Sequence, residues 1–294
     1  MKRKTYIPIL IIILLLLVVG SSCIGYRLYM KKQNAAVLSN IETIEQTDSK
    51  NTILRSGIFQ AFENNIFHAG IIPEGLEVVN LTPEQQAERV YSFSQGPRAY
   101  NEGRPWGGEW CQKIVKGNSF GGFGCGMCCM ANIYSTISPY ECSPWDMFEY
   151  ATQVTYYYPS RDGGAIGWGD IKTTLENTGF ECNVHRKPGS YEYFQEVIKK
   201  SKSAIVLVSS YNDDTFWEDT SGHYVNIYLY QEDTDMVFLA EPGDLEKNRT
   251  WVPLKYVYDA LKTASNFHYL TVEAYDEEKN NWKHNGIDEI WNGK

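Results

Sequence analysis

Basic residues are scarce in most of this sequence. The chain has 27 lysines and arginines against 36 aspartates and glutamates, and its formal net charge is −9. Six of the basic residues and none of the acidic ones lie in residues 1–32, so 21 basic residues face 36 acidic ones in the remainder. Because so acidic a body repels phosphate backbones, nucleic acid is excluded as a partner. The acidity favours basic peptides only weakly.

Charge is absent from residues 5–26, and residues 7–19 are almost entirely Ile, Leu and Val. An apolar stretch of about 20 residues is long enough to cross a membrane. An uncleaved N-terminal anchor is the favoured interpretation. A lipoprotein signal with acylated Cys23 and a cleaved signal peptide are the alternatives. Each of the three most simply places the rest of the chain outside the cytoplasm, as a single-pass, lipid-anchored or exported protein.

The sequence beyond this segment divides by composition. Residues 29–80 start polar and then mix short apolar runs with glycine and proline, which indicates a stalk or linker after an anchor or signal segment at 1–28. Residues 81–275 carry regular patterns of apolar residues and form the predicted folded domain. Residues 276–294 are charged, and we expect a loosely held tail. No internal repeat is visible.

The sequence also has no pair of Cys-x-x-Cys knuckles of the kind that holds structural zinc. A zinc site built from Cys125, Cys128, Cys129 and Cys142 is therefore weakly supported, and we predict no metal or other cofactor. The cysteine count is seven, so at least one thiol is unpaired or paired between chains. One disulfide among Cys111, Cys142 and Cys182 fits an exported protein. Cys128 and Cys129 fit the core side of a helix.

The pattern of apolar residues predicts helices first and strands later. Thr82 and Gln85 form a capping box around Pro83, which marks a helix start. A long loop, 96–124, follows. The predicted helices are 83–92, one that begins at Cys125, one that follows Ser143, 168–177, 191–200 and 254–261; the predicted strands are 204–209, 223–230, 236–240 and 269–274. This order is typical of an α+β domain.

Cys125 is the candidate nucleophile. Only the thiolate attacks a carbonyl, and a free thiol, with a pKa of about 8.5, becomes a thiolate more easily at a helix N-terminus or beside a histidinium. Cys125 starts a predicted helix, and it lies between Gly124 and Gly126, which allow a sharp turn and close approach of a substrate. A buried structural thiol is the plainer alternative.

His223 is the candidate base, because it begins a predicted strand after a polar, acidic loop. Glu241 ends the predicted return strand, so hairpin pairing brings it to the same edge, where it can orient the imidazole. Asp244 and Asn226 are alternatives for that orienting role. An oxyanion needs a second donor beside backbone N–H groups, and a side-chain amide supplies it in many enzymes. Gln95 is our candidate for this donor, and Gln112 is the second choice.

The order of these motifs resembles the bacteriocin-processing (double-glycine leader) peptidases and the related leader-peptidase-like domains of exported bacterial proteins. SQGPRAY is similar to their Gln segment, FGCGMCCMA to their nucleophile segment, SGHYVNIYLY to their base segment and LAEPGD to their orienter segment. The resemblance covers roughly residues 85–275 and implies a papain-like fold. It implies catalytic roles for Gln95, Cys125, His223 and Glu241, although Glu241 stands where the family has Asp or Asn.

The resemblance implies a cysteine peptidase that cleaves peptide bonds in a peptide or protein substrate through a Cys-His-acid triad. The transporter modules that accompany leader-processing enzymes are absent from this sequence, so the leader substrate does not carry over. The same triad serves amidases and transpeptidases that act on cell-wall peptides. A papain-like domain that binds peptides without cutting them is the alternative from a different class, and the presence of both nucleophile and base disfavours it.

Overall fold

The computed structural model describes residues 81–160 and 164–294. These residues belong to a unit that spans Asn64–Lys294. The expected anchor or signal segment at 1–28 and the expected stalk at 29–80 lie outside the described residues. Within residues 81–160 and 164–294, no helix has the length and apolar character that crossing a membrane requires.

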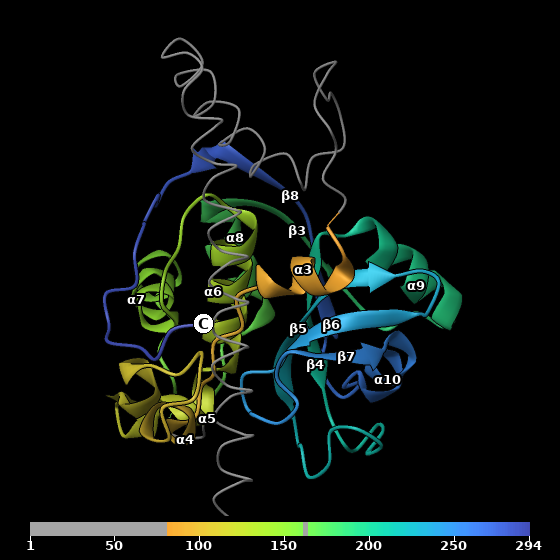
Figure 1. Cartoon of the computed structure of the whole chain (residues 1–294), viewed down its shortest axis with the longest axis horizontal. Helices are drawn as coiled ribbons and strands as arrows, with labels where there is room; N and C mark the ends of the chain where they lie inside the picture. Colours follow the sequence, from red (N-terminus) through yellow and green to blue (C-terminus); the bar gives the residue numbers. More distant parts are fainter. Residues whose placement is uncertain (1–80, 161–163) are drawn as a thin grey trace, which may run out of the picture. The chain divides into compact units, whose positions relative to one another are not determined.

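A six-stranded antiparallel sheet forms the centre of the fold (Figure 1). Its strand order is β3-β8-β4-β5-β6-β7. The strands are β3 (Thr178–His185), β4 (Ser203–Val208), β5 (His223–Gln231), β6 (Met236–Ala240), β7 (Thr250–Pro253) and β8 (Tyr269–Asn280). Of these, β4, β5, β6 and β8 were predicted from the sequence, while β3 and β7 were not. The sheet therefore confirms an antiparallel C-terminal half.

Helices cover both faces of this sheet (Figure 1). One face packs against α6 (Cys125–Ile137), α7 (Pro144–Thr155) and α8 (Trp168–Asn177), and the other against α9 (Tyr191–Lys200) and α10 (Leu254–Ala260). Ser143 caps α7 as predicted, because its hydroxyl accepts the N–H groups of Trp145 and Asp146. Helices that precede a largely antiparallel sheet confirm the α+β class.

Strand β5 lies between the two apolar clusters and so is buried on both faces. Tyr224 and Tyr228 pack in the cluster that contains α6, while Val225 and Ile227 pack in the cluster that contains α9 and α10. The predicted alternation therefore holds up to Tyr228. It ends at Leu229, which adopts a positive φ of 53° where the pairing with β6 shifts register.

The N-terminal part of the domain ties the helical half to the sheet. Helix α3 (Pro83–Glu88) starts with the expected capping box but ends four residues before position 92. The chain then runs extended along α6, where the Tyr91 N–H donates to Thr136 Oγ1 and the Phe93 N–H to Asn132 Oδ1. These bonds replace helical ones, which explains the early end of α3.

The long loop 96–124 contains short elements of its own. These are α4 (Pro97–Asn101), the 3₁₀ helix η1 (Glu109–Gln112), β1 (Ile114–Val115), β2 (Asn118–Ser119) and α5 (Phe120–Phe123). Strands β1 and β2 form a hairpin around Lys116 and Gly117, both with positive φ. Helix α5 ends at Phe123 with Gly124 as its C-cap, so the loop leads directly into Cys125.

Residues 276–294 differ from the expected loose tail. Strand β8 continues to Asn280 and pairs with β3. Farther on, Trp291 packs against Phe93 and Trp106, and the Trp106 N–H donates to the Gly293 carbonyl. Aromatic burial thus holds a segment whose charged residues suggested a solvated tail. The folded domain extends through these residues.

Candidate active site

Cys125 is the first residue of α6, as the sequence predicts. Its side chain is largely covered, with 6% of the residue exposed. The neighbouring glycines serve packing rather than a sharp turn, because Gly124 has ordinary helical φ and ψ. A Cβ on Gly124 would lie 2.4 Å from the Phe120 ring, and one on Gly126 would lie 2.5 Å from Ile166 Cγ2. The helix can start here only because both neighbours lack side chains.

His223 begins β5 and faces this cysteine, from a different layer of the fold. Its Nε2 makes a short hydrogen bond with Glu241 Oε1. A side-chain hydrogen bond also links His223 to Cys125. Since Nε2 is occupied by the glutamate, Nδ1 is the ring nitrogen left for the sulfur. The structure therefore brings Cys125, His223 and Glu241 together in that order.

Glu241 is almost fully buried, and other groups engage both of its carboxylate oxygens. Oε1 accepts the Gly243 N–H at 2.8 Å in addition to His223. Oε2 accepts the indole N–H of Trp217 at 2.8 Å. The Glu241 backbone N–H donates to Asn248 Oδ1. A buried carboxylate needs such donors, and this set fixes its direction toward the imidazole.

The carboxylate controls the charge of His223. Burial alone would lower the pKa of the imidazole, but the Glu241 charge and the hydrogen bonds to Cys125 and Glu241 outweigh it and raise the pKa from 6.5 to about 10. The imidazole therefore stays protonated through neutral pH. A charge on the Cys125 sulfur is one of the causes that raise the pKa of His223, so the two side chains interact.

Gln95 lies between the two halves of the site. Its backbone N–H donates to the Pro242 carbonyl, directly after Glu241. Its side-chain Nε2 donates to the Gly121 carbonyl at 2.7 Å, in the helical turn that leads to Cys125. An amide nitrogen carries two hydrogens, so a second N–H remains for another acceptor. The Gln95 Oε1 atom is buried and has no partner among the described residues.

The alternative candidates have other partners. Gln112 is exposed, and its Nε2 donates to Asn101. Asp244 caps the Glu246 N–H and pairs with Lys247. Asn226 is buried, and its Oδ1 accepts from Asn132. Neither Asp244 nor Asn226 is engaged with His223, which leaves Glu241 as the acid beside the imidazole in the described part of the chain.

Three residues near the cysteine were not singled out as site residues from the sequence. Tyr157 and Tyr224 are buried, and burial together with charge on Cys125 raises the pKa of both hydroxyls. Ile166 contacts the backbone side of Gly126, and its carbonyl accepts from the Tyr224 hydroxyl.

The other described cysteines have structural positions. Cys128 and Cys129 are buried in the core on α6, as predicted. Cys111, Cys142 and Cys182 are free thiols, so the expected disulfide among them is wrong for this structure. Cys111 lies in η1, Cys142 in the connection between α6 and α7, and Cys182 in β3. The Cys111 thiol donates instead to the Ser94 carbonyl at 3.2 Å.

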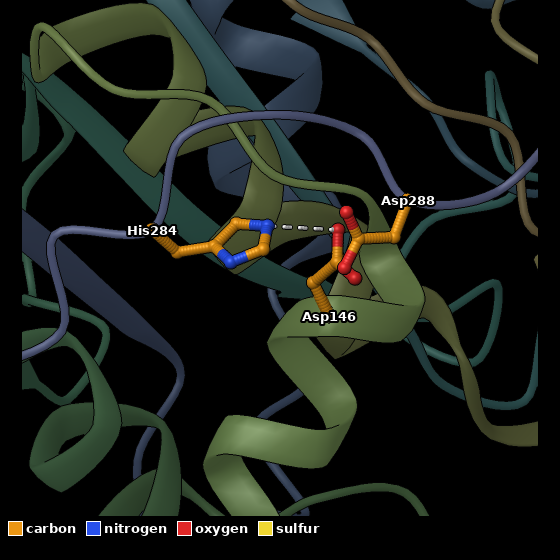
Figure 2. A group of neighbouring side chains, drawn as sticks. All are labelled: Asp146, His284 and Asp288. Carbon is orange, nitrogen blue, oxygen red and sulfur yellow. Dashed lines mark ion pairs between the residues drawn. The ribbon is translucent and has the colours of Figure 1, made fainter.

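One group of side chains has donor atoms spaced as for a metal ion. Asp146, His284 and Asp288 each offer a ligand atom, and these atoms lie within 4.8 Å of one another (Figure 2). His284 Nε2 lies 3.4 Å from Asp146 Oδ2 and 3.0 Å from the Gly286 carbonyl. The same Asp146 oxygen caps the Ser143 N–H. These contacts give Asp146 and His284 a structural role, because they link α7 to the C-terminal segment.

The geometry of the cysteine site suits nucleophilic attack on a carbonyl. A thiol at a helix start, an imidazolium held by a buried carboxylate and a nearby amide are the parts of covalent catalysis at acyl groups. No curated protein matches the chain. Residues 124–268, however, match the family model described as phytochelatin synthase. This range contains Cys125, His223 and Glu241, whereas Gln95 precedes it.

The matched family differs from the one that the motifs suggest, and the resemblance to the bacteriocin-processing peptidases is not confirmed. The match supports a cysteine-dependent enzyme, while the expected papain-like fold is not confirmed directly. Residues 124–268 are therefore similar to the phytochelatin synthase family.

Proposed function

We propose that this protein is a cysteine-dependent enzyme that cleaves peptide bonds and forms an acyl-enzyme on Cys125. The contact chain from Cys125 through His223 to Glu241 carries the proposal, because its order matches that of a nucleophile, a base and an orienting acid. Gln95 is the proposed side-chain donor to the oxyanion. The match of residues 124–268 to a family of cysteine-dependent acyltransferases and peptidases supports the same chemistry.

The proposed reaction starts from the thiolate–imidazolium pair. The sulfur attacks the substrate carbonyl carbon, and the electron pair of the C=O bond moves onto oxygen. The N–H of Cys125 and the free N–H of Gln95 stabilise this oxyanion. His223 then gives its proton to the departing amine as the C–N bond breaks. The acyl group is left as a thioester on Cys125, and His223 becomes neutral.

The acceptor of the acyl group defines the product. Neutral His223 deprotonates the incoming nucleophile, which attacks the thioester and releases Cys125. Water as acceptor makes the protein a peptidase, which is the function that the sequence motifs favour. The amine of a second peptide as acceptor makes it a transpeptidase. The phytochelatin synthase family model favours this second function.

We also propose that the domain is held at the outer side of a cell membrane by the apolar segment 5–26. This part of the proposal rests on the sequence alone. Membrane flotation of wild-type protein and of Cys23→Ser tests it. An uncleaved anchor predicts that both float with the membrane and keep their N-terminus, whereas a lipoprotein loses membrane attachment when Cys23 is replaced.

Turnover of a peptide library by the full chain tests the chemistry. Wild-type protein is incubated with the library, with and without a tenfold excess of an amine-bearing acceptor peptide, and products are identified by mass spectrometry. We expect cleaved products alone if water is the acceptor, and joined products as well if the enzyme transfers the acyl group. Cys125→Ala should form neither, while Cys142→Ala is the matched thiol control that retains activity. Absence of turnover together with an intact Cys125 thiol would instead indicate a peptide-binding domain.

A further inference from the structure

A cavity of about 300 Å³ lies beside the candidate active site, on the side of the Glu241 loop. It is defined here as the basic cavity, and its lining residues are Ser94, Arg104, Pro105, Trp106, Leu245, Asn248, Arg249 and Lys294. Its lining contains three basic residues and no acidic one, although the protein as a whole is acidic. The volume is large enough for a small molecule.

Two of the three basic residues of this cavity form no ion pair in the described part of the chain. Arg249 and Lys294 have no carboxylate within 4.0 Å among the described residues, whereas Arg104 pairs with Glu102 and Glu246. Burial lowers the pKa of both Arg249 and Lys294, and the charges of Glu88 on Arg249 and of Glu141 on Lys294 offset this only in part. The charge of Arg249 lowers the pKa of Lys294 further. Two mutually repelling cations beside one cavity are stabilised by an anion between them.

The positions of both cations are fixed by other contacts. The Arg249 guanidinium donates to the Val90 and Ala87 carbonyls and stacks over the Trp106 ring, 4.9 Å from its centroid. Lys294 Nζ lies 3.9 Å from the centroid of the Tyr91 ring. A guanidinium has five N–H groups, so those not used by the two carbonyls remain for a ligand.

Ser94 adds a neutral donor to the lining. Ser94 is fully buried, and its hydroxyl has no hydrogen-bond partner among the described residues. An unpaired buried hydroxyl costs about 1–3 kcal/mol. Its carbonyl is already engaged by Trp110 and Cys111, which hold this residue in place. The hydroxyl is therefore an unused, buried donor of a residue that lines the cavity.

We propose that the basic cavity binds a small anion, a carboxylate or phosphate group, with Arg249 and Lys294 as the charged contacts and Ser94 as a hydrogen-bond donor. Two residues connect the basic cavity to the candidate active site. Ser94 directly precedes Gln95, and Asn248 accepts the Glu241 N–H. An anion in the cavity would thus hold the segments that carry the oxyanion donor and the orienting acid.

Isothermal titration of the full chain tests this proposal without any turnover. Inorganic phosphate is one titrant and glutarate the other, each in a buffer free of other multivalent anions. We expect saturable binding of at least one, weakened about tenfold or more in Lys294→Gln and in Ser94→Ala. Tighter phosphate binding assigns the cavity to a phosphate ligand, and tighter glutarate binding assigns it to a carboxylate such as a peptide C-terminus.

The matched control is Lys279→Gln, which removes an exposed lysine that pairs with Asp276 on β8. It should bind both anions as wild type does. Ser94→Ala should also retain wild-type stability to urea in the absence of anions, because its hydroxyl has no partner to lose. The proposal is wrong if neither anion binds the wild type, if both cavity variants bind as wild type, or if the control is weakened equally.

Discussion

At the residue scale, the contacts of Glu241 decide the charge of His223. Glu241 has one methylene more than the Asp or Asn expected at this position, yet its Oε1 reaches the imidazole and its Oε2 reaches Trp217. The longer side chain is therefore accommodated by donors on both oxygens. Its position at the end of β6, opposite the start of β5, was predictable from the hairpin.

Glu241→Gln should lower kcat/KM by about 100-fold or more, because the imidazole loses the charge that keeps it protonated and oriented. His223 has a pKa of about 10 with Glu241 in place. Without the carboxylate the pKa falls, so the alkaline limb of the pH–rate profile should move to lower pH. The profile of kcat/KM against pH for both proteins measures this, and an unmoved alkaline limb contradicts it.

The same pair should make stability depend on pH. The folded pKa of His223 lies above its ordinary value of 6.5. The imidazolium therefore contributes its full stabilisation below about pH 6.5, and this contribution is lost as pH rises toward about 10. Urea unfolding of wild type and Glu241→Gln should show the largest stability gap at acidic pH and a smaller gap near pH 10. A gap independent of pH would contradict this assignment.

Trp217→Phe should remove one donor from Glu241 while keeping an aromatic ring. The unpaired buried oxygen costs about 1–3 kcal/mol, and we expect a lower kcat with little change in KM, together with a shifted alkaline limb. Phe216→Leu, next in the chain, is the control that leaves the Glu241 bonds intact. Equal effects of both substitutions on the pH profile would show that Trp217 acts only through packing.

Sequence could not identify Trp217 as a site residue. It lies in an irregular loop, and its contact with Glu241 spans 24 residues. Cys125 and His223 were found because each begins a regular element whose start is visible in the pattern of apolar residues. Gln95 was found by its motif alone, and its link to Gly121 depends on how the loop folds back.

At the element scale, the start of α6 depends on close packing against Ile166 and Tyr224. Gly126→Ala should destabilise the protein by about 1–3 kcal/mol, because the new Cβ would lie 2.5 Å from Ile166 Cγ2. Gly169→Ala is the matched control, since a Cβ at this helical glycine on α8 meets no atom within 4 Å. Urea unfolding measures both, and the control should be neutral or slightly stabilised. Equal stability of the two variants would contradict the packing account.

Elements with strong local signals were predicted, and those without were missed. The capping residues of α3 and α7 and the alternation in β5 are such signals. Strand β3 was missed because it follows α8 without a break, although Phe180 and Cys182 are buried between exposed Glu181 and Asn183. Strand β7 has four residues and is positioned by its pairing with β6, which no local pattern reveals.

At the scale of the whole domain, the C-terminal segment closes the helical half. Its Trp291 contacts Phe93 and Trp106, and the Asn292 side chain donates to the carbonyls of Ala99, Tyr100 and Arg104. The sequence suggested a tail because charge there is dense, and long-range aromatic contacts of this kind cannot be read from composition. This segment therefore supports the loop 96–124, which directly follows Gln95.

Trp291→Ala should destabilise the domain by about 2–4 kcal/mol, since it removes an aromatic side chain that packs on two others. Activity at temperatures below unfolding should fall as well, because Phe93 lies two residues from Gln95. Ile290→Ala is the neighbouring control, and it should be nearly neutral because Ile290 is 69% exposed. If Trp291→Ala is as stable as the wild type, the prediction is wrong and the segment is loosely held.

The central claim is that His223 holds Cys125 as a reactive thiolate, and alkylation kinetics test it most directly. At about pH 6 a free thiol is less than about 1% thiolate, so wild-type Cys125 should react with iodoacetamide at least about tenfold faster than free cysteine. His223→Ala should lose this advantage, while mass spectrometry should show the buried Cys128, Cys129 and Cys142 unmodified. A Cys125 that reacts no faster than free cysteine, and equally fast in both proteins, would contradict the account.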